Sequence, residues 1–286
     1  RYPSIRLALW PWSTVGRLLD ENRPQAIHIA TEGPLGLAAR LYCGLRRLPF
    51  TTAFHTRFPE YLRVYAKIPQ RISYRALRWF HDRAHRTLVP TESLKTELEA
   101  HGFTGLVRWM RGVDTELFRP RSGAPYDLPR PVFLYAGRVA AEKNIGAFLA
   151  LDLPGSKVVV GDGPARAGLE AAHPEVHWAG MRVGEDLARH YAGADVFVFP
   201  SKTDTFGVVM LEAFASGLPV AAYPVTGPID VVEHGVTGFL DDDLGRACRG
   251  ALELDPVVCR AHACSLSWNA CARMLFDNLA VIARDD

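Results

Sequence analysis

Short apolar runs rich in β-branched residues recur along this chain, and longer segments with helical periodicity separate them. Parallel strands need a crossover between them, usually a helix, so this alternation is typical of parallel sheets covered by helices. The sequence therefore predicts an α/β fold. The expected strands lie at residues 26–30, 50–54, 87–90, 132–136, 157–160, 195–199 and 219–223.

The length of 286 residues favours two domains, because domains most often contain about 100–150 residues. Residues 119–131 hold four prolines and one glycine without apolar periodicity, which predicts a linker. We expect an N-terminal domain at residues 1–124, a second domain at 125–267 and a terminal helix at 268–286.

The composition excludes several classes of protein. With 48% hydrophobic and 22% charged residues, the chain is not predominantly disordered. No apolar run approaches the roughly 18 residues that cross a bilayer, and the first residues lack the pattern of a signal peptide. A cytoplasmic protein is expected.

The cysteines and histidines indicate no metal site. The five cysteines contain no Cys-x-x-Cys pair and are expected to be reduced structural residues, and the ten histidines form no His-Glu-x-x-His motif. The acidic run Asp241, Asp242 and Asp243 follows a short apolar segment and is expected to form an exposed turn. Neither a metal nor a cofactor is predicted.

A polar loop follows the run 195–199 and precedes a helix expected to begin near Gly207 and to end at Gly217. Ligands of open α/β sheets bind at the carboxyl ends of strands, and the N–H groups of a helix N-terminus suit a phosphate. Glu212, further along this helix, could accept hydrogen bonds from a diol such as a ribose. Taken alone, the spacing of these two acids is a weak signal, and a solvated acid at the helix start is the alternative for Asp204.

Two further loops follow expected strands. The first carries Arg138 and Lys143, two cations that could offset negative charge on a diphosphate without a metal. Two such cations alone are usually solvated surface residues. The second loop is a predicted tight turn with the sequence Gly161, Asp162 and Gly163.

Two polar residues in the first half of the chain also follow expected strands. His55 comes directly after the run 50–54, and Glu32 comes shortly after the run 26–30. Both therefore lie where open α/β sheets bind ligands, and both are candidate site residues. A structural role is the alternative for each of them.

The polar loop and its helix resemble the acid-x7-Glu signature of the family-4 retaining glycosyltransferases, with Asp204 where the usual form has Glu. Gly137, Arg138 and Lys143 are similar to the Gly-Arg-x4-Lys element of the same enzymes. Residues 111–118 look like the Asn-Gly-Val-Asp stretch that precedes their interdomain linker, so the resemblance extends over nearly the whole chain.

This resemblance implies a GT-B fold, in which two Rossmann-like domains with parallel sheets face a central cleft. It implies that Arg138 and Lys143 stabilise the departing diphosphate and that Glu212 holds the ribose, with no protein nucleophile. The other implied donor-binding residues are Gly137, Gly161, Asp162, Gly163, Asp204, Thr205, Phe206, Gly207 and Val208. The implied catalytic residues are His55, Arg138, Lys143 and Asp204. His55 is included because related enzymes carry a His-Thr pair close to the transferred sugar, and His55 and Glu32 are the candidates for the acceptor side.

The start of the chain departs from the family pattern. Family members open with a strand and a glycine-rich loop that contact the acceptor and the donor phosphate. This chain begins with Arg1, Tyr2 and Pro3, beyond that region. We therefore expect an N-terminal domain that lacks its first strand.

Charge is divided unevenly along the chain. Residues 1–130 carry 21 Lys and Arg against 11 Asp and Glu, whereas residues 131–286 carry 12 against 20. Residues 57–86 interleave eight basic residues with aromatic ones, which suits adsorption to an anionic membrane surface. A packed helix with arginines along its surface is the alternative. No nucleic-acid-binding motif accompanies this charge, so nucleic acid is not expected as a partner.

Together these features predict a retaining hexosyltransferase that moves a sugar from a nucleotide-sugar to a lipid or glycan acceptor. The His-Thr stretch looks most like that of enzymes that glycosylate diacylglycerol, including the sulfoquinovosyl diacylglycerol synthases, so a lipid acceptor is preferred. The protein is then expected at the inner face of the plasma membrane. The alternatives are a mannosyl- or glucosyltransferase for soluble glycans, a nucleotide-sugar epimerase on the same scaffold, and a non-catalytic remnant that binds nucleotide.

Overall fold

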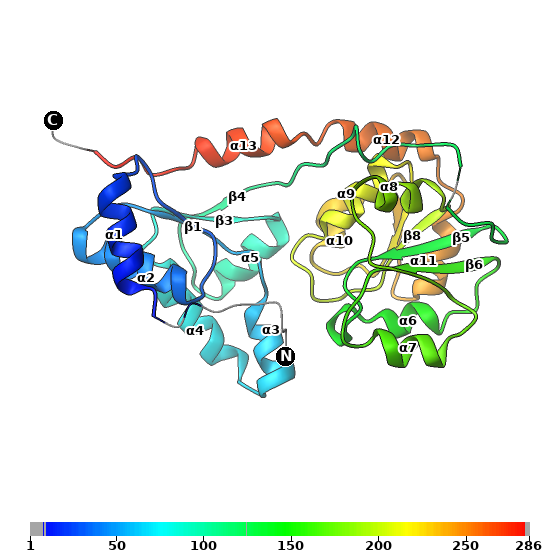
Figure 1. Ribbon diagram of the computed structural model, residues 1–286, viewed down its shortest axis with the longest axis horizontal. Helices are drawn as coiled ribbons and strands as arrows, with labels where there is room; N and C mark the ends of the chain where they lie inside the picture. The colour runs from blue at the N-terminus through cyan, green and yellow to red at the C-terminus, as the bar shows by residue number, and fades with distance from the viewer. Residues whose placement is uncertain (1–7, 9, 124, 284–286) are drawn as a thin grey trace. The chain divides into compact units, whose positions relative to one another are not determined.

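The computed structural model describes residues 8, 10–123 and 125–283, and it divides into two compact units. Unit 1 consists of Arg1–Met110 and Ala272–Asp286, and unit 2 consists of Arg111–Cys271. Figure 1 shows that each unit is a sheet with helices packed around it. The division falls between Met110 and Arg111, so it does not coincide with the predicted boundary at 124/125.

Unit 1 contains a parallel sheet of four strands in the order β1-β2-β3-β4. The strands are β1 (His28–Ile29), β2 (Thr51–Ala53), β3 (Arg86–Val89) and β4 (Leu106–Arg108). The helices before and between them are α1 (Trp12–Asn22), α2 (Pro34–Arg46), α3 (Phe58–Ala66), α4 (Gln70–His81) and α5 (Glu92–Ala100). Apart from α1, each helix lies in a crossover between neighbouring parallel strands, as the alternation predicts.

Two clusters of buried apolar side chains hold the short strands of unit 1 together. The first joins β3 to α4 and α5, and it contains Phe54, Tyr74, Leu77, Val89, Leu94, Leu98 and Phe103. The second lies under α2 and contains Ile27, Ile29, Cys43, Phe50 and Phe80. Helix α5 begins where the Thr91 hydroxyl accepts a hydrogen bond from the Leu94 N–H at 3.3 Å, a typical N-cap.

The chain returns to unit 1 at its C-terminal end. Helix α13 (Trp268–Phe276) starts within unit 2 and ends within unit 1. Beyond it, the Ile282 N–H donates to the Gln25 carbonyl at 2.8 Å, and Val281 forms an antiparallel bridge with Ala26. The helix is therefore shorter than the predicted segment 268–286, of which residues 284–286 lie outside the described residues.

Unit 2 contains a parallel sheet of six strands in the order β10-β9-β8-β5-β6-β7. The strands are β5 (Val132–Ala136), β6 (Ser156–Val160), β7 (His177–Gly180), β8 (Val196–Phe199), β9 (Val220–Ala222) and β10 (Gly238–Leu240). Its helices are η1 (Ala141–Lys143), α6 (Ile145–Leu149), α7 (Arg166–Ala172), α8 (Gly184–Ala192), α9 (Val208–Ala215), α10 (Pro228–Val231), α11 (Leu244–Ala251) and α12 (Pro256–Cys264).

Both faces of the unit 2 sheet are buried, which explains why its strands are nearly continuous apolar runs. Val132, Leu134 and Ala136 of β5 point into one cluster, which α8, α9 and α12 complete. Phe133 and Tyr135 point into the opposite cluster, which α6 and α11 complete. The alternation along a single strand is the period of two expected of a β-strand with helices on both sides.

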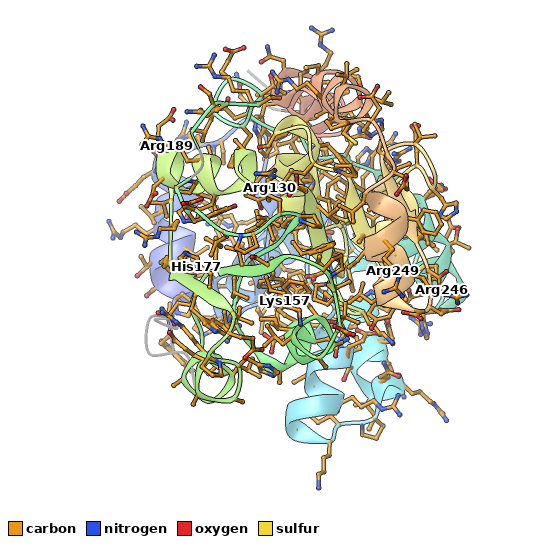
Figure 2. The ribbon with its side chains drawn as sticks, turned by 90° about the vertical axis from the view of Figure 1, so that its right-hand side faces the viewer. Arg130, Lys157, His177, Arg189, Arg246 and Arg249 are labelled. Atoms are coloured by element: carbon orange, nitrogen blue, oxygen red, sulfur yellow. The ribbon has the colours of Figure 1, made fainter. Side chains whose placement is uncertain are left out.

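Figure 2 labels several basic side chains of unit 2, and three of them bond groups of the same unit. The Lys157 ammonium donates to the Leu149 carbonyl at 2.6 Å, which satisfies the C-terminal end of α6. The Arg130 guanidinium pairs with Asp195. Arg246 pairs with Asp241 at 2.8 Å. These cations therefore stabilise unit 2 itself.

Other parts of the structure also differ from the sequence predictions. Strands β4 and β7 were not predicted, since neither is an uninterrupted β-branched run. The proline-rich stretch packs on unit 2, because the Tyr126 hydroxyl donates to the His190 carbonyl at 2.8 Å and Leu128 contacts the core. It is therefore not the boundary between the units.

Two expectations about special residues can be compared with the structure directly. All five cysteines are free, and four of them are buried. Asp243 caps α11, because its carboxylate accepts from the Gly245 N–H at 2.8 Å and from the Arg246 N–H at 3.1 Å. The acidic run at residues 241–243 thus forms a helix-capping turn. Every helix in the described part of the chain is too short or too polar to span a bilayer.

Candidate functional site

The strand order of unit 2 reverses between β5 and β8, which are neighbours in the sheet. From β5 the chain runs outward through β6 to β7, then returns to β8 and continues outward through β9 to β10. Open α/β sheets bind ligands outside the carboxyl ends of the strands at such a reversal. The loops after β5, β6 and β8 meet here, and they carry most of the predicted donor-binding residues.

Lys143 and Asp204 come together across this reversal. The Lys143 ammonium lies 2.5 Å from Asp204 Oδ1, and the two side chains are 23% and 17% exposed. The other carboxylate oxygen of Asp204 is buried and has no hydrogen-bond partner among the described residues. Because this oxygen is an unsatisfied acceptor, the pair can still take a hydrogen bond from a hydroxyl group.

Two more hydrogen bonds fix the same loops to each other. The Asn144 side-chain amide donates to the Pro200 carbonyl at 3.1 Å, and the Thr203 hydroxyl donates to the Glu142 carbonyl at 3.3 Å. These bonds join the loop after β5 to the loop after β8. The positions of Lys143 and Asp204 are therefore fixed by contacts between the two loops as well as by their own ion pair. Asp204 does not cap α9, whose first turn follows Gly207.

Glycine is required where the loops after β5 and β6 approach each other. A Cβ atom at Gly161 would lie 1.8 Å from the Gly137 carbonyl oxygen, and one at Gly163 would lie 2.3 Å from the Val139 carbonyl oxygen. Both glycines also have φ values, +141° and +159°, that other residues rarely adopt. The Val139 N–H donates to the Asp162 carbonyl at 2.9 Å, which ties the two loops together.

Arg138 lies beside Glu142 at the same edge of the sheet. The guanidinium is 3.2 Å from the Glu142 carboxylate, whose side chain is 7% exposed. Beneath them, the Tyr135 hydroxyl donates to the Arg138 carbonyl at 2.8 Å. Burial raises the pKa of Tyr135 well above its usual range, so this hydroxyl stays a hydrogen-bond donor. Each predicted cation of the site therefore has a carboxylate neighbour.

The start of α9 presents backbone N–H groups next to these loops. Gly207 precedes the helix with φ +85°, and a Cβ atom there would lie 2.8 Å from Met210 and 2.9 Å from Phe199. No side chain caps this helix within the described residues. Val208 is its first residue, and Phe206 packs against the core from the preceding loop. Thr205 lies in that loop too, between Asp204 and Phe206.

Glu212 lies on α9 and accepts a hydrogen bond from a buried tyrosine of α8. The Tyr191 hydroxyl donates to Glu212 Oε2 at 2.8 Å. Burial raises the pKa of Glu212, and the Tyr191 hydrogen bond lowers it. The carboxylate is thus half-buried and held by one partner, an arrangement that suits recognition of a hydroxyl group.

His55 and Glu32 lie at the carboxyl ends of β2 and β1 in unit 1. The His55 ring lies 5.7 Å from the Trp109 ring, which also contacts the His28 ring at 6.1 Å. Trp109 follows β4, His55 follows β2, and His28 is the first residue of β1. Aromatic rings from three strands or their ends therefore meet around Trp109. His55 thus packs beside Trp109, and its role in the site stays a prediction.

The Glu32 carboxylate bonds a histidine of α4. Its Oε1 lies 3.2 Å from His81 Nε2, and the two side chains are 9% and 2% exposed. His81 Nδ1 lies 2.8 Å from the Thr52 hydroxyl, which in turn lies 2.9 Å from the Thr87 hydroxyl. Glu32 therefore belongs to a buried polar chain across the sheet, which the sequence did not indicate.

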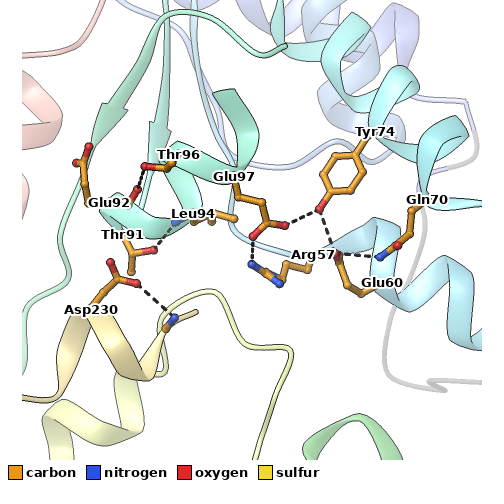
Figure 3. A network of polar contacts seen from close by, with 11 residues as sticks. Arg57, Glu60, Gln70, Tyr74, Thr91, Glu92, Leu94, Thr96, Glu97 and Asp230 are labelled. Carbon is orange, nitrogen blue, oxygen red and sulfur yellow. Dashed lines mark hydrogen bonds and ion pairs between the residues drawn. The ribbon is translucent and has the colours of Figure 1, made fainter. Parts of the chain in front are cut away.

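A second polar network surrounds the segment after His55 (Figure 3). Arg57 pairs with Glu97 of α5, and the Tyr74 hydroxyl lies 3.0 Å from both Glu97 and Glu60. Gln70 donates to Glu60 at 3.3 Å. These bonds fasten α3 and α4 to α5, so they hold the chain that follows His55 in one place.

Sequence reasoning missed the side chains that support the predicted residues. Tyr135, Tyr191, Glu142, His81 and Trp109 each contact a predicted residue or its backbone. Tyr135 and Glu142 are close in sequence to Arg138, so their proximity to it in space could be predicted. Tyr191 and His81 lie far from their partners along the chain, and no local pattern marks them.

The roles implied for the site residues stay predictions. The predicted donor-binding residues of unit 2 gather at the carboxyl edge of its sheet, and His55 and Glu32 lie at the carboxyl edge of the unit 1 sheet. The described residues contain no group of three or more histidine, cysteine, aspartate or glutamate side chains suited to a metal ion.

Comparison with protein families finds two matches. Residues 1–117 match the model described as "Glycosyltransferase Family 4", and residues 130–252 match the model described as "Glycosyl transferases group 1".

Three curated relatives are named as sugar transferases. A GDP-mannose-dependent α-mannosyltransferase of Corynebacterium glutamicum is 31% identical over 259 residues, which cover 85% of this chain and 63% of that protein. An enzyme of the same name from Mycobacterium tuberculosis is 36% identical, with 78% and 62% covered. A sulfoquinovosyl transferase of Arabidopsis thaliana is 32% identical, with 82% and 50% covered. The chain thus spans between half and two thirds of the length of these relatives.

Solved structures resemble the whole chain at low sequence identity. A sucrose-phosphate synthase from Thermosynechococcus elongatus has a TM-score of 0.76 and 21% identity, covering 96% of this chain and 80% of that one. The Anabaena protein HepE in complex with UDP-glucose has a TM-score of 0.72 and 16% identity, covering 93% and 80%. These likenesses confirm the predicted fold class, α/β with parallel sheets of the GT-B type.

Proposed function

Because the chain belongs to the group 1 and family 4 glycosyltransferases, we propose that it transfers a hexose from a nucleotide-sugar to an acceptor with retention of configuration. The observation that carries this proposal is the meeting of Lys143 and Asp204 at the reversal of the unit 2 sheet. That position pairs a cation for phosphate with an unsatisfied acceptor for a sugar hydroxyl.

In this proposal the residues of unit 2 hold the donor. Lys143 and Arg138 offset the charge that develops on the departing diphosphate, and the N–H groups at the start of α9 support the phosphate. Asp204 accepts a hydrogen bond from the sugar, and Glu212 accepts one from the ribose. The proposed chemistry needs no metal, because cations and N–H groups supply the positive charge.

The first test is a transfer assay on this chain. It is incubated with GDP-mannose, UDP-glucose or UDP-sulfoquinovose, and with vesicles containing diacylglycerol or with soluble glycans. Mass spectrometry then identifies the product, and the anomeric configuration is read by NMR. A product with the inverted anomer contradicts retention. An isomerised donor without any acceptor would indicate an epimerase, and nucleotide binding without product would indicate a non-catalytic remnant.

We propose that the acceptor is a membrane lipid, because one face of α4 suits an anionic lipid surface. Arg71 and Arg75 are exposed on this face, together with Ile72 at 61% and Trp79 at 53% exposure. The guanidinium of Arg40 lies 3.8 Å from the centroid of the Trp79 ring, which keeps the indole at the surface. Cations beside exposed apolar side chains are typical of helices that lie in the membrane interface.

Arg78 contributes differently from its neighbours on α4. Its guanidinium donates to the His101 carbonyl at 3.4 Å and lies 3.9 Å from Asp82, so it supports the fold. A test of lipid binding should therefore change Arg71 and Arg75 only. The proposed location of the protein, at the cytoplasmic face of a membrane, depends on this same surface.

Vesicle cosedimentation tests the lipid surface. Each basic side chain near an anionic bilayer contributes about 1 kcal/mol, so Arg71→Ser with Arg75→Ser should weaken binding by about 10-fold or more. The matched control is Arg182→Ser with Arg189→Ser on unit 2, since both of these arginines are exposed. Equal binding to neutral and anionic vesicles would contradict the proposal and favour a soluble glycan acceptor.

A further inference from the structure

Tyr191 of α8 is fully buried, and its hydroxyl reaches the Glu212 carboxylate of α9. The O–H lies 2.8 Å from Glu212 Oε2 and 3.5 Å from the Val209 carbonyl oxygen. Within the part of the chain that the structure describes, no other group bonds the Glu212 carboxylate. The tyrosine therefore engages one carboxylate oxygen and leaves Oε1 for another partner.

The Tyr191 ring is held firmly by its aromatic neighbours. It stacks on Phe197 of β8 with ring centroids 5.5 Å apart, and Phe118 meets it edge-on at the same separation. Since Tyr191 has no exposed surface, its ring cannot turn without disturbing the core. The hydroxyl is consequently fixed at one point beneath α9.

We infer that Tyr191 is a positioning residue for nucleotide recognition, which holds the Glu212 carboxylate through Oε2 and so directs Oε1 to a ribose hydroxyl of the donor. The inference rests on the proposed function, in which Glu212 binds the ribose. Tyr191 itself does not touch the ligand in this account. It acts only through the carboxylate that it orients.

The electrostatics of the pair give the inference a pH-dependent readout. Burial raises the pKa of Glu212, and the hydrogen bond from Tyr191 opposes that rise. Without the hydroxyl, the pKa of Glu212 should rise further, and the carboxylate should become protonated at a higher pH.

Other titratable groups on the elements packed against α9 have different partners. On α12, Arg260 bonds the Ala215 carbonyl at 2.7 Å and His262 lies 3.4 Å from Glu233. On α8, His190 bonds the Asp186 carbonyl at 2.7 Å. On β5, Tyr135 bonds the Arg138 carbonyl. Glu212 is therefore the group on which the loss of the Tyr191 hydroxyl acts directly.

The experiment measures the affinity of the protein for UDP and for GDP by calorimetry between pH 5 and pH 8. Tyr191→Phe keeps the ring and removes the hydroxyl. A lost hydrogen bond to a charged group should raise the Kd by about 10-fold or more. The decline of affinity on the acid side should also begin at a higher pH than in the wild type. Titration of the nucleotide phosphate is common to every variant, so it cancels in the comparison.

Tyr126→Phe is the matched control. The Tyr126 hydroxyl also donates to a backbone carbonyl within unit 2, that of His190, and has no contact with Glu212. The Kd and its pH dependence should be the same as in the wild type. A shift in this control equal to that of Tyr191→Phe would assign the effect to general loosening of unit 2 and would overturn the inference.

Glu212→Gln completes the test and covers the case in which Tyr191→Phe fails to fold. The amide does not titrate in this range, so the acid-side decline that depends on Glu212 should disappear. Persistence of the full decline would overturn the inference. Wild-type binding with an unaffected Tyr191→Phe variant would overturn the inference alone, whereas a wild type that binds neither nucleotide would overturn the proposed function as well.

Discussion

The contribution of the ion pair between Lys143 and Asp204 to stability can be measured separately from its contribution to sugar transfer. The two side chains are 23% and 17% exposed, so the pair is intermediate between a surface pair and a buried one. Exposed pairs contribute about 0–1 kcal/mol, and breaking a buried pair costs about 3–5 kcal/mol. We therefore expect Lys143→Met or Asp204→Asn to lower the free energy of unfolding by about 1–3 kcal/mol.

The double variant should behave differently in stability and in turnover. Removing both partners leaves no uncompensated charge, so the loss in unfolding free energy should be clearly smaller than the sum of the two single losses. The effects on kcat/KM should not cancel in this way, because Lys143 and Asp204 are proposed to bind different parts of the donor. Lys143→Met should lower kcat/KM by about 100-fold, which corresponds to about 3 kcal/mol of transition-state stabilisation.

Urea denaturation of the four proteins measures the first quantity, and initial rates of sugar transfer measure the second. Arg182→Met is the control, since Arg182 is exposed and pairs with the exposed Asp186 at 3.2 Å. If the losses in stability add and Lys143→Met transfers sugar at the wild-type rate, the pair is a surface contact and the donor assignment is wrong.

Three further changes have defined outcomes. Asp204→Glu should keep transfer but change the preference among nucleotide-sugars in a competition assay, because the carboxylate extends by one methylene; an unchanged preference would argue against contact with the sugar. Gly161→Ala should lower the free energy of unfolding by about 3 kcal/mol or more and abolish nucleotide binding, because a Cβ atom there would lie 1.8 Å from a carbonyl oxygen. The control Gly168→Ala places its Cβ atom in open space and should be neutral or stabilising in thermal unfolding. Arg260→Met should lower the free energy of unfolding, measured by urea denaturation, by about 2–3 kcal/mol, because the guanidinium bonds three carbonyl oxygens at 2.7–2.9 Å. A loss of unfolding free energy no larger than that of the exposed control Arg189→Met would contradict this role.

The strands of unit 2 were predictable because both faces of the sheet are buried. Residues 132–136 and 157–160 therefore read as continuous apolar runs, and the observed strands β5 and β6 closely match them. Strand β7 contains His177 and Trp178 and lies at the sheet edge, so its sequence carries no such run. Strand β4 is also an edge strand and is only three residues long.

The loops of the site were predictable from local sequence, but their supports were not. Gly137, Gly161 and Gly207 stand directly after strands or before a helix, where backbone geometry demands glycine. The bond from Tyr191 to Glu212 spans 21 residues and depends on how α8 packs beside α9. The Pro-rich stretch was misjudged for a similar reason, because Tyr126 finds its partner 64 residues away.

The return of the chain to unit 1 has a consequence for biosynthesis. Unit 2 is formed by consecutive residues, so it can close its sheet while the chain is still being made. Unit 1 draws its last contacts from Val281 and Ile282, which bond the segment at Gln25 and Ala26. These contacts join two parts of one unit that are synthesised before and after the whole of the other. Unit 1 therefore remains incomplete on the ribosome until unit 2 has emerged.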